Sequence, residues 1–307
     1  MSPKNLITIN SISEYHEIFE LPRPSHPLLS ITELKRINSQ MKPFLLENKF
    51  VFDFYSISIK KNIKGNIRYG RQNLDFREGV MAFSSPKQIF SFDDSIDLSE
   101  LSGWYLIFHK DFIRNYDLAR KIKNFHFFSY ELHEALHLSQ KEEATIDSIM
   151  RNIQEEHLTS IDSFSQDLMV SQIELLIHYS NRFYNRQFIT RKNSNHDTLI
   201  RLEKILEEYF ESNKVSELGL PTVKYISFQL NISPSYLSDL LKNITGQNAQ
   251  RHIHDWIIEK AKEKLTTTSL SINEIAFQLG FEYPQYFSRL FKAKTKLSPL
   301  EFRNSFD

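Results

Sequence analysis

Ile275-Ala-Phe-Gln-Leu279, followed by Tyr286-Phe-Ser-Arg-Leu-Phe-Lys292, is the stretch that decides the fold of the C-terminal part of this chain. The same pattern occurs earlier as Ile226-Ser-Phe-Gln-Leu230 and Tyr236-Leu-Ser-Asp-Leu-Leu-Lys242. The two copies lie roughly 50 positions apart, and self-similarity of this kind is typical of a structural unit that is used twice. The sequence therefore predicts an internal repeat.

Each copy carries the signals of a helix, a tight turn and a second helix. In the first copy, Ser233 suits the N-cap of the second helix and Pro234 suits its first position. In the second copy, Ser271-Ile-Asn-Glu274 is a capping box, Gly280 ends the first helix and Pro284 begins the next. Both copies are therefore predicted to be helix-turn-helix units.

The segment between the copies sets their spacing. Arg251–Leu265 is predicted to form one connecting helix, and a helix of about 15 residues is ~22 Å long. With the flanking units added, the two second helices should lie roughly one DNA turn, ~34 Å, apart. One chain would then present two recognition helices to successive major grooves, so we expect it to bind double-stranded DNA.

The side chains predicted to be exposed on the two second helices differ in charge. The candidate DNA contacts are Ser235, Ser238, Asp239 and Lys242 in the first copy and Gln285, Ser288, Arg289 and Lys292 in the second. Glutamine can pair with adenine and arginine with guanine, whereas lysine and serine suit phosphate contacts. From Arg289 to Lys296 there are four cations and no acid. The alternative is that both sets are solvated helix faces without a ligand.

At these residues the sequence resembles the AraC/XylS family of bacterial transcription regulators. The resemblance covers about Leu199–Phe306. It is carried by both repeat copies, the connecting helix, and the segments Ser233-Pro-Ser-Tyr-Leu237, Thr245-Gly246, Leu279-Gly-Phe281, Ser298-Pro299 and Phe302-Arg303. It implies that the helices beginning at Pro234 and Pro284 read bases.

Two positions depart from the family pattern. Asp239 stands where the family often has arginine or lysine, which weakens a contact driven by positive charge in the first copy. Lys296 replaces a frequent glycine after Thr295, which leaves the geometry of that turn open.

The N-terminal part has the texture of short strands. Val51–Ile59 alternates apolar and polar residues, as a half-buried strand does. Further short runs follow at Ile67–Tyr69, Gly79–Phe83, Gln88–Phe92 and Trp104–Phe108. Strands at this spacing predict a sandwich or barrel. The turn Tyr69-Gly-Arg71 and the segment Asp75–Gly79 resemble the family's cupin-type sensor, which implies a small-molecule effector bound inside a barrel.

Two amphipathic helices are predicted after the strands. Ser139-Gln-Lys-Glu142 is a capping box, and Ile146, Ile149, Met150 and Ile153 follow it at helical spacing. A second helix runs from about Ile161 to Phe188, with an apolar stripe at Leu168, Ile173, Leu176 and Ile177. Either its own domain or a second copy of the chain can cover such a stripe, and the resemblance implies a homodimer.

The predicted fold class is α+β, with four segments. Residues 1–138 form a cupin-like effector-sensing domain, and residues 139–189 form a helical dimerisation segment. Residues 190–198 are polar and Asn-rich and are interpreted as a linker. Residues 199–307 form an all-α DNA-binding domain of the AraC type with two helix-turn-helix units.

Composition excludes several other classes of protein. The 307 residues include 38 Lys+Arg and 38 Asp+Glu, so the formal net charge is zero and a uniformly basic nucleic-acid coat is excluded. Cysteine is absent, which excludes disulfides and thiolate chemistry and fits a reducing cytoplasm. No stretch approaches the ~18–20 apolar residues of a membrane-spanning helix, and the N-terminus lacks a secretion signal. We expect a cytoplasmic location and no membrane contact.

Two metal-enzyme alternatives receive little support. His133-Glu-Ala-Leu-His137 fits HExxH, which supplies two zinc ligands and a general base when it is helical. The capping box at Ser139 indicates that a helix begins only after this motif. A metal-dependent cupin enzyme needs several barrel histidines, but Val51–Phe108 has none and His109 stands alone after it.

The sequence therefore predicts a non-enzymatic regulator with no catalytic residue, metal or cofactor. Its expected partners are promoter or operator DNA, a small-molecule effector and a second copy of the chain, with RNA polymerase as the further partner that the resemblance implies. The alternative is a regulator without an effector, controlled by its own level or by a protein partner.

Overall fold

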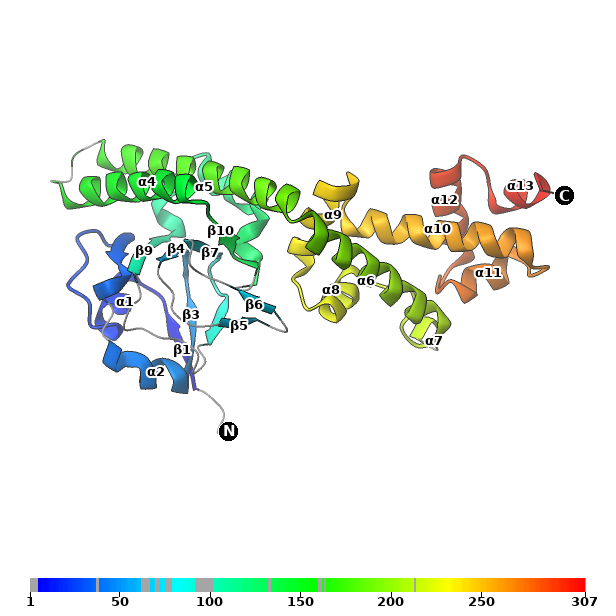
Figure 1. Ribbon diagram of the computed structural model, residues 1–307, viewed down its shortest axis with the longest axis horizontal. Coiled ribbons are helices and arrows are strands. Elements are labelled where there is room, and N and C mark those ends of the chain that lie inside the picture. The colour runs from blue at the N-terminus through cyan, green and yellow to red at the C-terminus, as the bar shows by residue number, and fades with distance from the viewer. Residues whose placement is uncertain are drawn as a thin grey trace. The chain divides into compact units, whose positions relative to one another are not determined.

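The chain folds into two compact units, Met1–Gln187 and Phe188–Asp307. The first combines sheets with helices, and the described residues of the second are helical or in turns, which confirms the predicted α+β class (Figure 1). The computed structural model describes residues 5–36, 39–61, 67–69, 72–74, 79–91, 102–131, 134–159, 162, 164–212 and 214–306.

Three sheets account for the described strands of the first unit. The largest has five strands in the order β10-β7-β4-β9-β2, a second has the order β1-β3-β8, and β5 pairs with β6. The strands are β1 (Asn5–Ile9), β2 (Leu29–Glu33), β3 (Asn48–Phe52), β4 (Phe54–Lys61), β5 (Ile67–Tyr69), β6 (Gln72–Leu74), β7 (Val80–Ser84), β8 (Ile89–Ser91), β9 (Ser102–His109) and β10 (Leu136–His137). Strands β5, β7, β8 and β9 lie at predicted runs, whereas β1, β2, β6 and β10 were not predicted. A cupin-type barrel stays a prediction.

The single strand predicted over Val51–Ile59 is wrong. The chain leaves β3 at Phe52, passes Asp53 and enters β4 in the other sheet. Both Phe52 and Phe54 are buried, and their rings stack with centroids 5.1 Å apart. Phe52 and Phe54 are two positions apart and both apolar, so they fit the alternation expected of one continuous strand. The sequence pattern therefore gives no sign of the break between the two sheets. The predicted turns at 65–66, 70–71, 75–78 and 93–95 lie outside the described residues.

One face of the five-stranded sheet is covered by helices. Trp104 Nε1 of β9 donates a hydrogen bond of 2.8 Å to Asp147 Oδ1, which lies on α4 (Gln140–Leu158). Phe83 of β7 lies against Tyr184 of α5 (Ser165–Thr190), with ring centroids 6.1 Å apart. The shorter helices are α1 (Ile12–Ile18), α2 (Lys42–Glu47) and α3 (Leu118–Lys121).

The opposite face of this sheet meets an aromatic cluster. Phe50, Phe52 and Phe54 pack with Tyr15 of α1 and Ile107 of β9, and all five are buried. Tyr105 of β9 packs against the same cluster. Toward the other end of β4 this face carries the hydroxyl side chains of Ser56 and Ser58, both buried.

The helices after the strands agree with the prediction in position but not in every side chain. The capping box at Ser139 is formed, and α4 begins at the next residue. On α5, Ile173, Leu176 and Ile177 are buried as predicted. Leu168 is 51% exposed, so its place in the buried stripe is wrong. It lies on a different side of the helix from Ile173, because five residues turn an α-helix by well over a full circle.

The predicted linker, 190–198, is not an irregular segment. Helix α6 (Lys192–Glu211) begins inside it, after a single non-helical residue, Arg191. The Asn195 side chain is buried and donates a hydrogen bond of 2.5 Å to the carbonyl oxygen of Phe188. An Asn-rich run usually marks a loop, but here one asparagine is used to join the ends of two helices.

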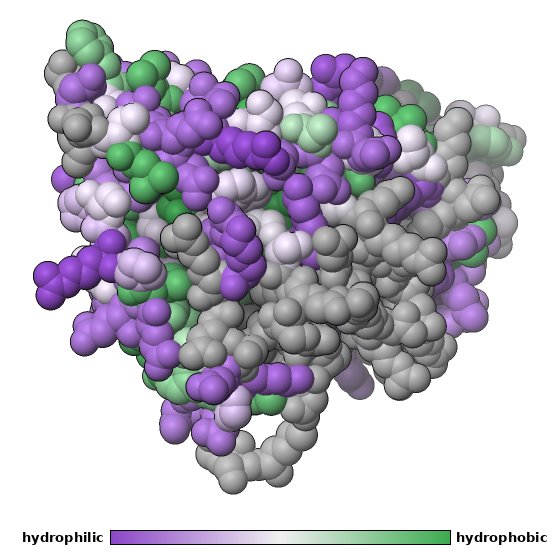
Figure 2. Space-filling model, turned by 60° about the vertical axis from the view of Figure 1, so that its left-hand side comes forward, coloured by the Kyte–Doolittle hydropathy of each residue, from purple (hydrophilic) through white to green (hydrophobic). Residues whose placement is uncertain are grey.

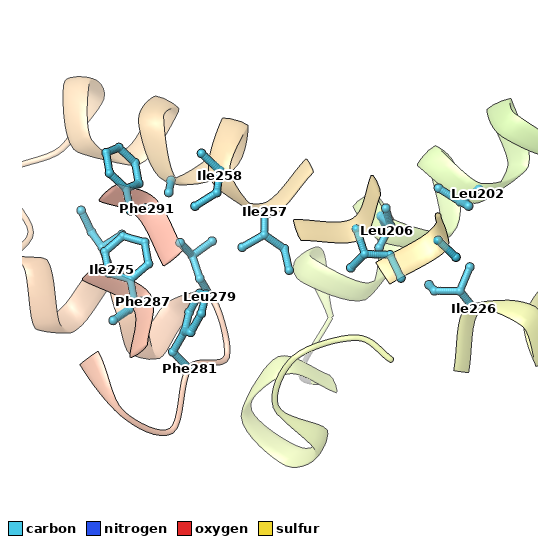
Figure 3. Packing of buried hydrophobic residues seen from close by; sticks show 14 of the residues in the cluster. Leu202, Leu206, Ile226, Ile257, Ile258, Ile275, Leu279, Phe281, Phe287 and Phe291 are labelled. Carbon is cyan, nitrogen blue, oxygen red and sulfur yellow. The ribbon is translucent and has the colours of Figure 1, made fainter. Parts of the chain in front are cut away.

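The second unit is built around one long helix. It contains α6, α7 (Lys214–Leu218), α8 (Val223–Leu230), α9 (Pro234–Thr245), α10 (Ala249–Thr267), α11 (Ile272–Gln278), α12 (Pro284–Thr295) and α13 (Pro299–Asn304). Ile257 of α10 lies within a single buried cluster that reaches from Ile226 of the first copy to Phe291 of the second (Figure 3). Helix α10 is longer than the predicted Arg251–Leu265, and its buried side chains belong to the core that both copies share.

The surface is mixed in character. On the face seen in Figure 2, hydrophobic side chains are interspersed with hydrophilic ones. Among the described residues, none of the helices combines the length and apolar character needed to cross a bilayer.

Three enclosed histidines should make the stability of the first unit depend on pH. His16 Nε2 and Ser30 Oγ lie 2.7 Å apart, and burial lowers the pKa of His16, His26 and His157 below the ordinary value of 6.5. The unfolded chain takes up these protons more readily, so stability is complete above pH ~6.5 and falls as the pH drops toward the lowered pKa values. We expect a lower urea midpoint for this unit at pH 5.5 than at pH 7.5. The variant His157→Gln should show a smaller difference, and equal midpoints in the unaltered protein would contradict the prediction.

Candidate nucleic-acid interface

The second helix of each repeat copy begins where the sequence predicts. Ser233 caps α9 by accepting a hydrogen bond of 3.1 Å from the Tyr236 backbone N–H, and Pro234 is the first helical residue. Pro284 begins α12, although its N-cap, Tyr283, makes no side-chain capping bond. The capping box at Ser271 is formed at the start of α11. A side-chain cap thus begins α9, whereas α12 begins at Pro284 without one.

Helix α12 separates an aromatic side from a polar side. Phe287 and Phe291 are fully buried, with ring centroids 5.8 Å apart. The other side carries Gln285, Arg289 and Lys292, which are exposed, and Ser288, which is half-buried. We call these four residues the α12 face.

The predicted side chains of the α12 face are therefore brought together. Their spacing of three and four residues places them on one side of a helix. Among the residues that the structure describes, neither Arg289 nor Lys292 has an acidic partner within ion-pair distance. Both cations are available to an external anion such as a DNA phosphate.

One of the four cations counted near the end of α12 is already neutralised. Lys294 forms an ion pair with Asp255 of α10, and its side chain is mostly enclosed. The prediction that Lys294 is a solvent-exposed cation is wrong. Its partner, Asp255, is distant in the sequence, so the local pattern around Lys294 gives no sign of the pairing. Lys296 is exposed, so the available cations are Arg289, Lys292 and Lys296.

The conformation of Lys296 defines the turn after α12, whose geometry the sequence left open. It is the C-cap of α12 with φ +70°, the left-handed conformation that Gly246 adopts at φ +76° at the end of α9. Lysine in this conformation costs more than glycine because its Cβ crowds the backbone. The two copies therefore end their second helices in the same way despite the departure from the family pattern.

Helix α9 is less basic than α12. Leu237, Leu240 and Leu241 are buried, and Lys242 is exposed. The remaining predicted contacts, Ser235, Ser238 and Asp239, are half-buried. The structure places all four predicted residues on the side away from the leucines, but only one of them is a cation.

Helix α10 sets how far apart the two second helices lie. Its 19 residues correspond to ~28 Å, compared with ~22 Å expected for the shorter predicted helix. Helix α9 packs near the N-terminal end of α10, and α12 crosses it further along (Figure 1). The presentation of the two helices to successive major grooves stays a prediction.

Arg303, part of the motif that ends the resemblance, has a structural role. Its Nε donates to the Leu265 carbonyl oxygen at 3.1 Å and its Nη2 donates to the Leu270 carbonyl oxygen at 2.7 Å. These bonds satisfy acceptors near the C-terminal end of α10, where helices leave carbonyl groups unpaired. This arginine joins α13 to the α10–α11 connection.

The described residues of the HExxH motif do not form the α-helix on which such a zinc site is built. His133 lies outside the described residues. Glu134 is buried and accepts a hydrogen bond of 2.7 Å from the Glu131 backbone N–H, while His137 lies in strand β10. Helix α4 begins only at Gln140. Within the described part of the chain, no group of three or more His, Asp or Glu side chains could hold a metal ion.

The family match lies in the second unit. A family described as "Helix-turn-helix domain" matches residues 226–305. Over 98 residues the chain is 32% identical to an uncharacterized HTH-type transcriptional regulator of Pseudoalteromonas carrageenovora, covering 32% of this chain and 56% of that protein. Over 75 residues it is 37% identical to the xylose operon regulatory protein of Escherichia coli strain K12, covering 24% of this chain and 19% of that protein.

A solved structure matches the same region. It is the C-terminal domain of AraT, a response regulator from Geobacillus stearothermophilus, with 30% identity, a TM-score of 0.31, and coverage of 35% of this chain and 84% of that one. The chain spans about half of the first curated relative and a smaller part of the second.

Proposed function

Because the chain belongs, through the helix-turn-helix domain at its C-terminus, to the AraC/XylS family of transcription regulators, we propose that it is a sequence-specific DNA-binding transcription regulator. It acts in the cytoplasm and has no catalytic activity. The observation that carries the proposal is the α12 face, an exposed and cationic surface on a repeated helix-turn-helix unit. The names of the matched relatives support it, since those proteins are regulators.

The two second helices divide the work of recognition. Gln285 and Arg289 contact base edges in one major groove, and Ser288 and Lys292 contact phosphates beside it. Ser235, Ser238, Asp239 and Lys242 of α9 form the second and weaker contact. Helix α9 lacks an excess of positive charge, so its contribution rests on hydrogen bonding and on Asp239 accepting from a cytosine amino group.

Selection of DNA fragments by the full chain tests the proposal. From a random pool we expect enrichment of a site with two elements about 10 base pairs apart, since the two helices would enter successive major grooves. Residues 221–307 contain 11 Lys+Arg and 8 Asp+Glu, and this slight excess of positive charge predicts weak non-specific binding, so the enrichment should be clear at physiological salt. Failure to enrich any sequence would contradict the proposed function.

The first unit is proposed to bind a small-molecule effector that modulates DNA binding. A buried polar patch on the sheet face away from α4 and α5 supports this, because enclosed polar side chains can orient a ligand. In the patch, the hydroxyls of Ser56 and Ser84 lie 2.6 Å apart and Ser58 donates to the Ala82 carbonyl oxygen at 3.4 Å. A ligand that binds only the folded state raises the melting temperature by mass action, so a thermal-shift screen tests the proposal. If no small molecule shifts the melting temperature, a regulator controlled by its level or by a protein partner is favoured.

An exposed apolar side of α5 supports a homodimer. Leu168 and Leu175 of α5 are 51% and 43% exposed, and Phe164, the residue before α5, is 66% exposed. The three recur at the spacing of one helix side. The buried residues Ile173 and Leu176 lie on the other side and pack within the unit. Helix α5 therefore has one apolar side that packs within its own unit and another that is exposed. We propose that the α5 of a second copy covers the exposed side.

Charge introduced on this exposed side should separate the dimer. Removing two leucines from an interface forfeits about 3–6 kcal/mol, so Leu168→Lys with Leu175→Lys is expected to weaken dimerisation at least roughly 100-fold. Sedimentation measures the change. The control is Ile89→Lys, which places a charge at an exposed isoleucine of β8 and should leave the dimer intact. A double variant that remains dimeric would show that the interface lies elsewhere.

A further inference from the structure

Two neighbouring lysines on the central strand of the five-stranded sheet have opposite surroundings. Lys61 points to the helix-covered face, where its Nζ lies 2.8 Å from Asp147 Oδ1 and 3.0 Å from Glu143 Oε1. Lys60 is on the other face, because successive residues of a strand alternate. It is half-buried, and among the described residues no acidic side chain lies within ion-pair distance of its ammonium group.

The positions around Lys60 carry short or hydroxyl side chains. Lys60 is paired with Val80 on β7 and with Gly103 on β9. Two residues earlier, Ser58 is paired with Ala82 and Tyr105. In a sheet, these residues share one face with Lys60, within reach of a long side chain.

Gly103, the residue paired with Lys60 on β9, has no side chain. Its φ is +115°, and a Cβ atom added there would lie 2.0 Å from the Ile59 carbonyl oxygen. No other residue fits without moving the β4 backbone. The sheet therefore presents a lone ammonium group next to a position that holds no side chain and beside two hydroxyl groups.

An unpaired lysine in such surroundings opposes folding. Burial lowers the pKa of Lys60, since the charged form loses water and gains no counter-ion from the described residues. For Lys61, burial also lowers the pKa, but the hydrogen bonds to Asp147 and Glu143 outweigh this effect and the pKa is raised. A charge that costs stability in the empty protein gains its counter-ion when an anion binds.

We propose that Lys60 is the anchor for a small organic carboxylate, which is the class of effector that the first unit binds. The inference rests on the effector proposal above. The ammonium pairs with the carboxylate. Ser58 and Tyr105 on the same sheet face make the surroundings polar; the Ser58 hydroxyl donates to the Ala82 carbonyl oxygen at 3.4 Å, and the Tyr105 hydroxyl is hydrogen-bonded to Ser56. A single lysine balances a single negative charge, whereas a dianion such as phosphate would keep one charge unpaired in these surroundings.

The aromatic cluster suits the apolar part of such a ligand. Tyr105 lies between the Lys60 end of the face and the cluster, with its ring centroid 5.8 Å from that of Tyr15. Burial raises the pKa of Tyr105 to about 12, so its hydroxyl, which is hydrogen-bonded to Ser56, keeps its proton. We therefore expect carboxylates with an apolar body to bind more tightly than acetate.

Thermal shift with the full chain tests the inference. The probes are acetate, hexanoate and benzoate, each compared with its neutral alcohol. At about 100 times the dissociation constant, a bound carboxylate should raise the melting temperature of the first unit by roughly 5–10 °C. Lys60→Met should weaken this binding about 10- to 100-fold, since a charge-assisted contact is lost. Lys49→Met removes an exposed lysine of β3 and should leave binding unchanged.

Each outcome separates the carboxylate inference from the effector proposal. If Lys60→Met binds carboxylates as the unaltered chain does, the assignment of Lys60 is wrong. If only neutral compounds raise the melting temperature, the effector proposal stands and the carboxylate class is wrong. If neither class has an effect, the effector proposal itself is contradicted. Without ligand, Lys60→Met should melt at the same or a higher temperature, and a fall of several degrees would indicate that Lys60 is a structural residue instead.

Discussion

Replacing Gly280 by alanine is expected to destabilise the helical unit by about 3 kcal/mol. Gly280 lies in the turn between α11 and α12 with φ +84°, and a Cβ atom there would lie 2.8 Å from the Gly219 carbonyl carbon and 2.9 Å from its oxygen. The substitution adds backbone strain and a contact with backbone atoms that cannot rotate away. The free energy of unfolding from urea titration measures the loss, and weaker DNA binding should accompany it.

Gly246→Ala is the matched control for this prediction. Gly246 has a similar φ of +76°, but no atom lies within 4 Å of the position of the added Cβ. Only the backbone strain then remains, so a loss of about 1 kcal/mol is expected. Lys296, at φ +70° in the equivalent place of the second copy, already carries a side chain in this conformation. Equal losses for Gly280→Ala and Gly246→Ala would show that the contact with Gly219 has no energetic consequence.

Arg289→Ala should reduce the affinity for the selected DNA site by about 1–3 kcal/mol, or roughly 5- to 150-fold. Arg289 is exposed on the α12 face and has no acidic partner among the described residues, so its removal should leave the fold unchanged. An arginine that reads a guanine carries sequence information, so the preference at one base position should also relax. Fluorescence anisotropy with the selected site and its single-base variants measures both effects.

Lys292→Ala distinguishes a phosphate contact from a base contact. Its loss should weaken binding evenly across sequences and lower the salt slope by about one. Lys204→Ala removes an exposed cation of α6, which pairs with Glu208, and serves as the control for a general change of charge. If Arg289→Ala and Lys292→Ala both bind as the unaltered protein does, α12 is not the reading helix.

The sequence determined the helix-turn-helix units because their signals are local. Ser233 and Pro234 begin α9 through contacts within four residues, and the capping boxes at Ser139 and Ser271 act over the same short range. The repeat then located the exposed side of α12, since helical spacing alone separates Arg289 from Phe287. The helix-turn-helix character of the C-terminal region and the candidate reading residues followed from this short-range information.

The strands and the charges could be predicted less well. Asp53 separates two strands of different sheets, and no residue near it announces the change. Lys294 is neutralised by Asp255, and Leu168 lies on the exposed side of α5. These properties depend on which distant segment a side chain meets.

The adjacent lysines of β4 show most directly which properties follow from local sequence and which from tertiary packing. By sequence, Lys60 and Lys61 are equivalent members of a pair. Tertiary structure places Asp147 and Glu143 of α4 beside Lys61, and for Lys60 the described residues offer hydroxyls and no acid. Local sequence determines how the backbone turns, because caps and turns act within a few residues. Only the packing of distant elements decides which charges are paired, and therefore where an external anion could bind.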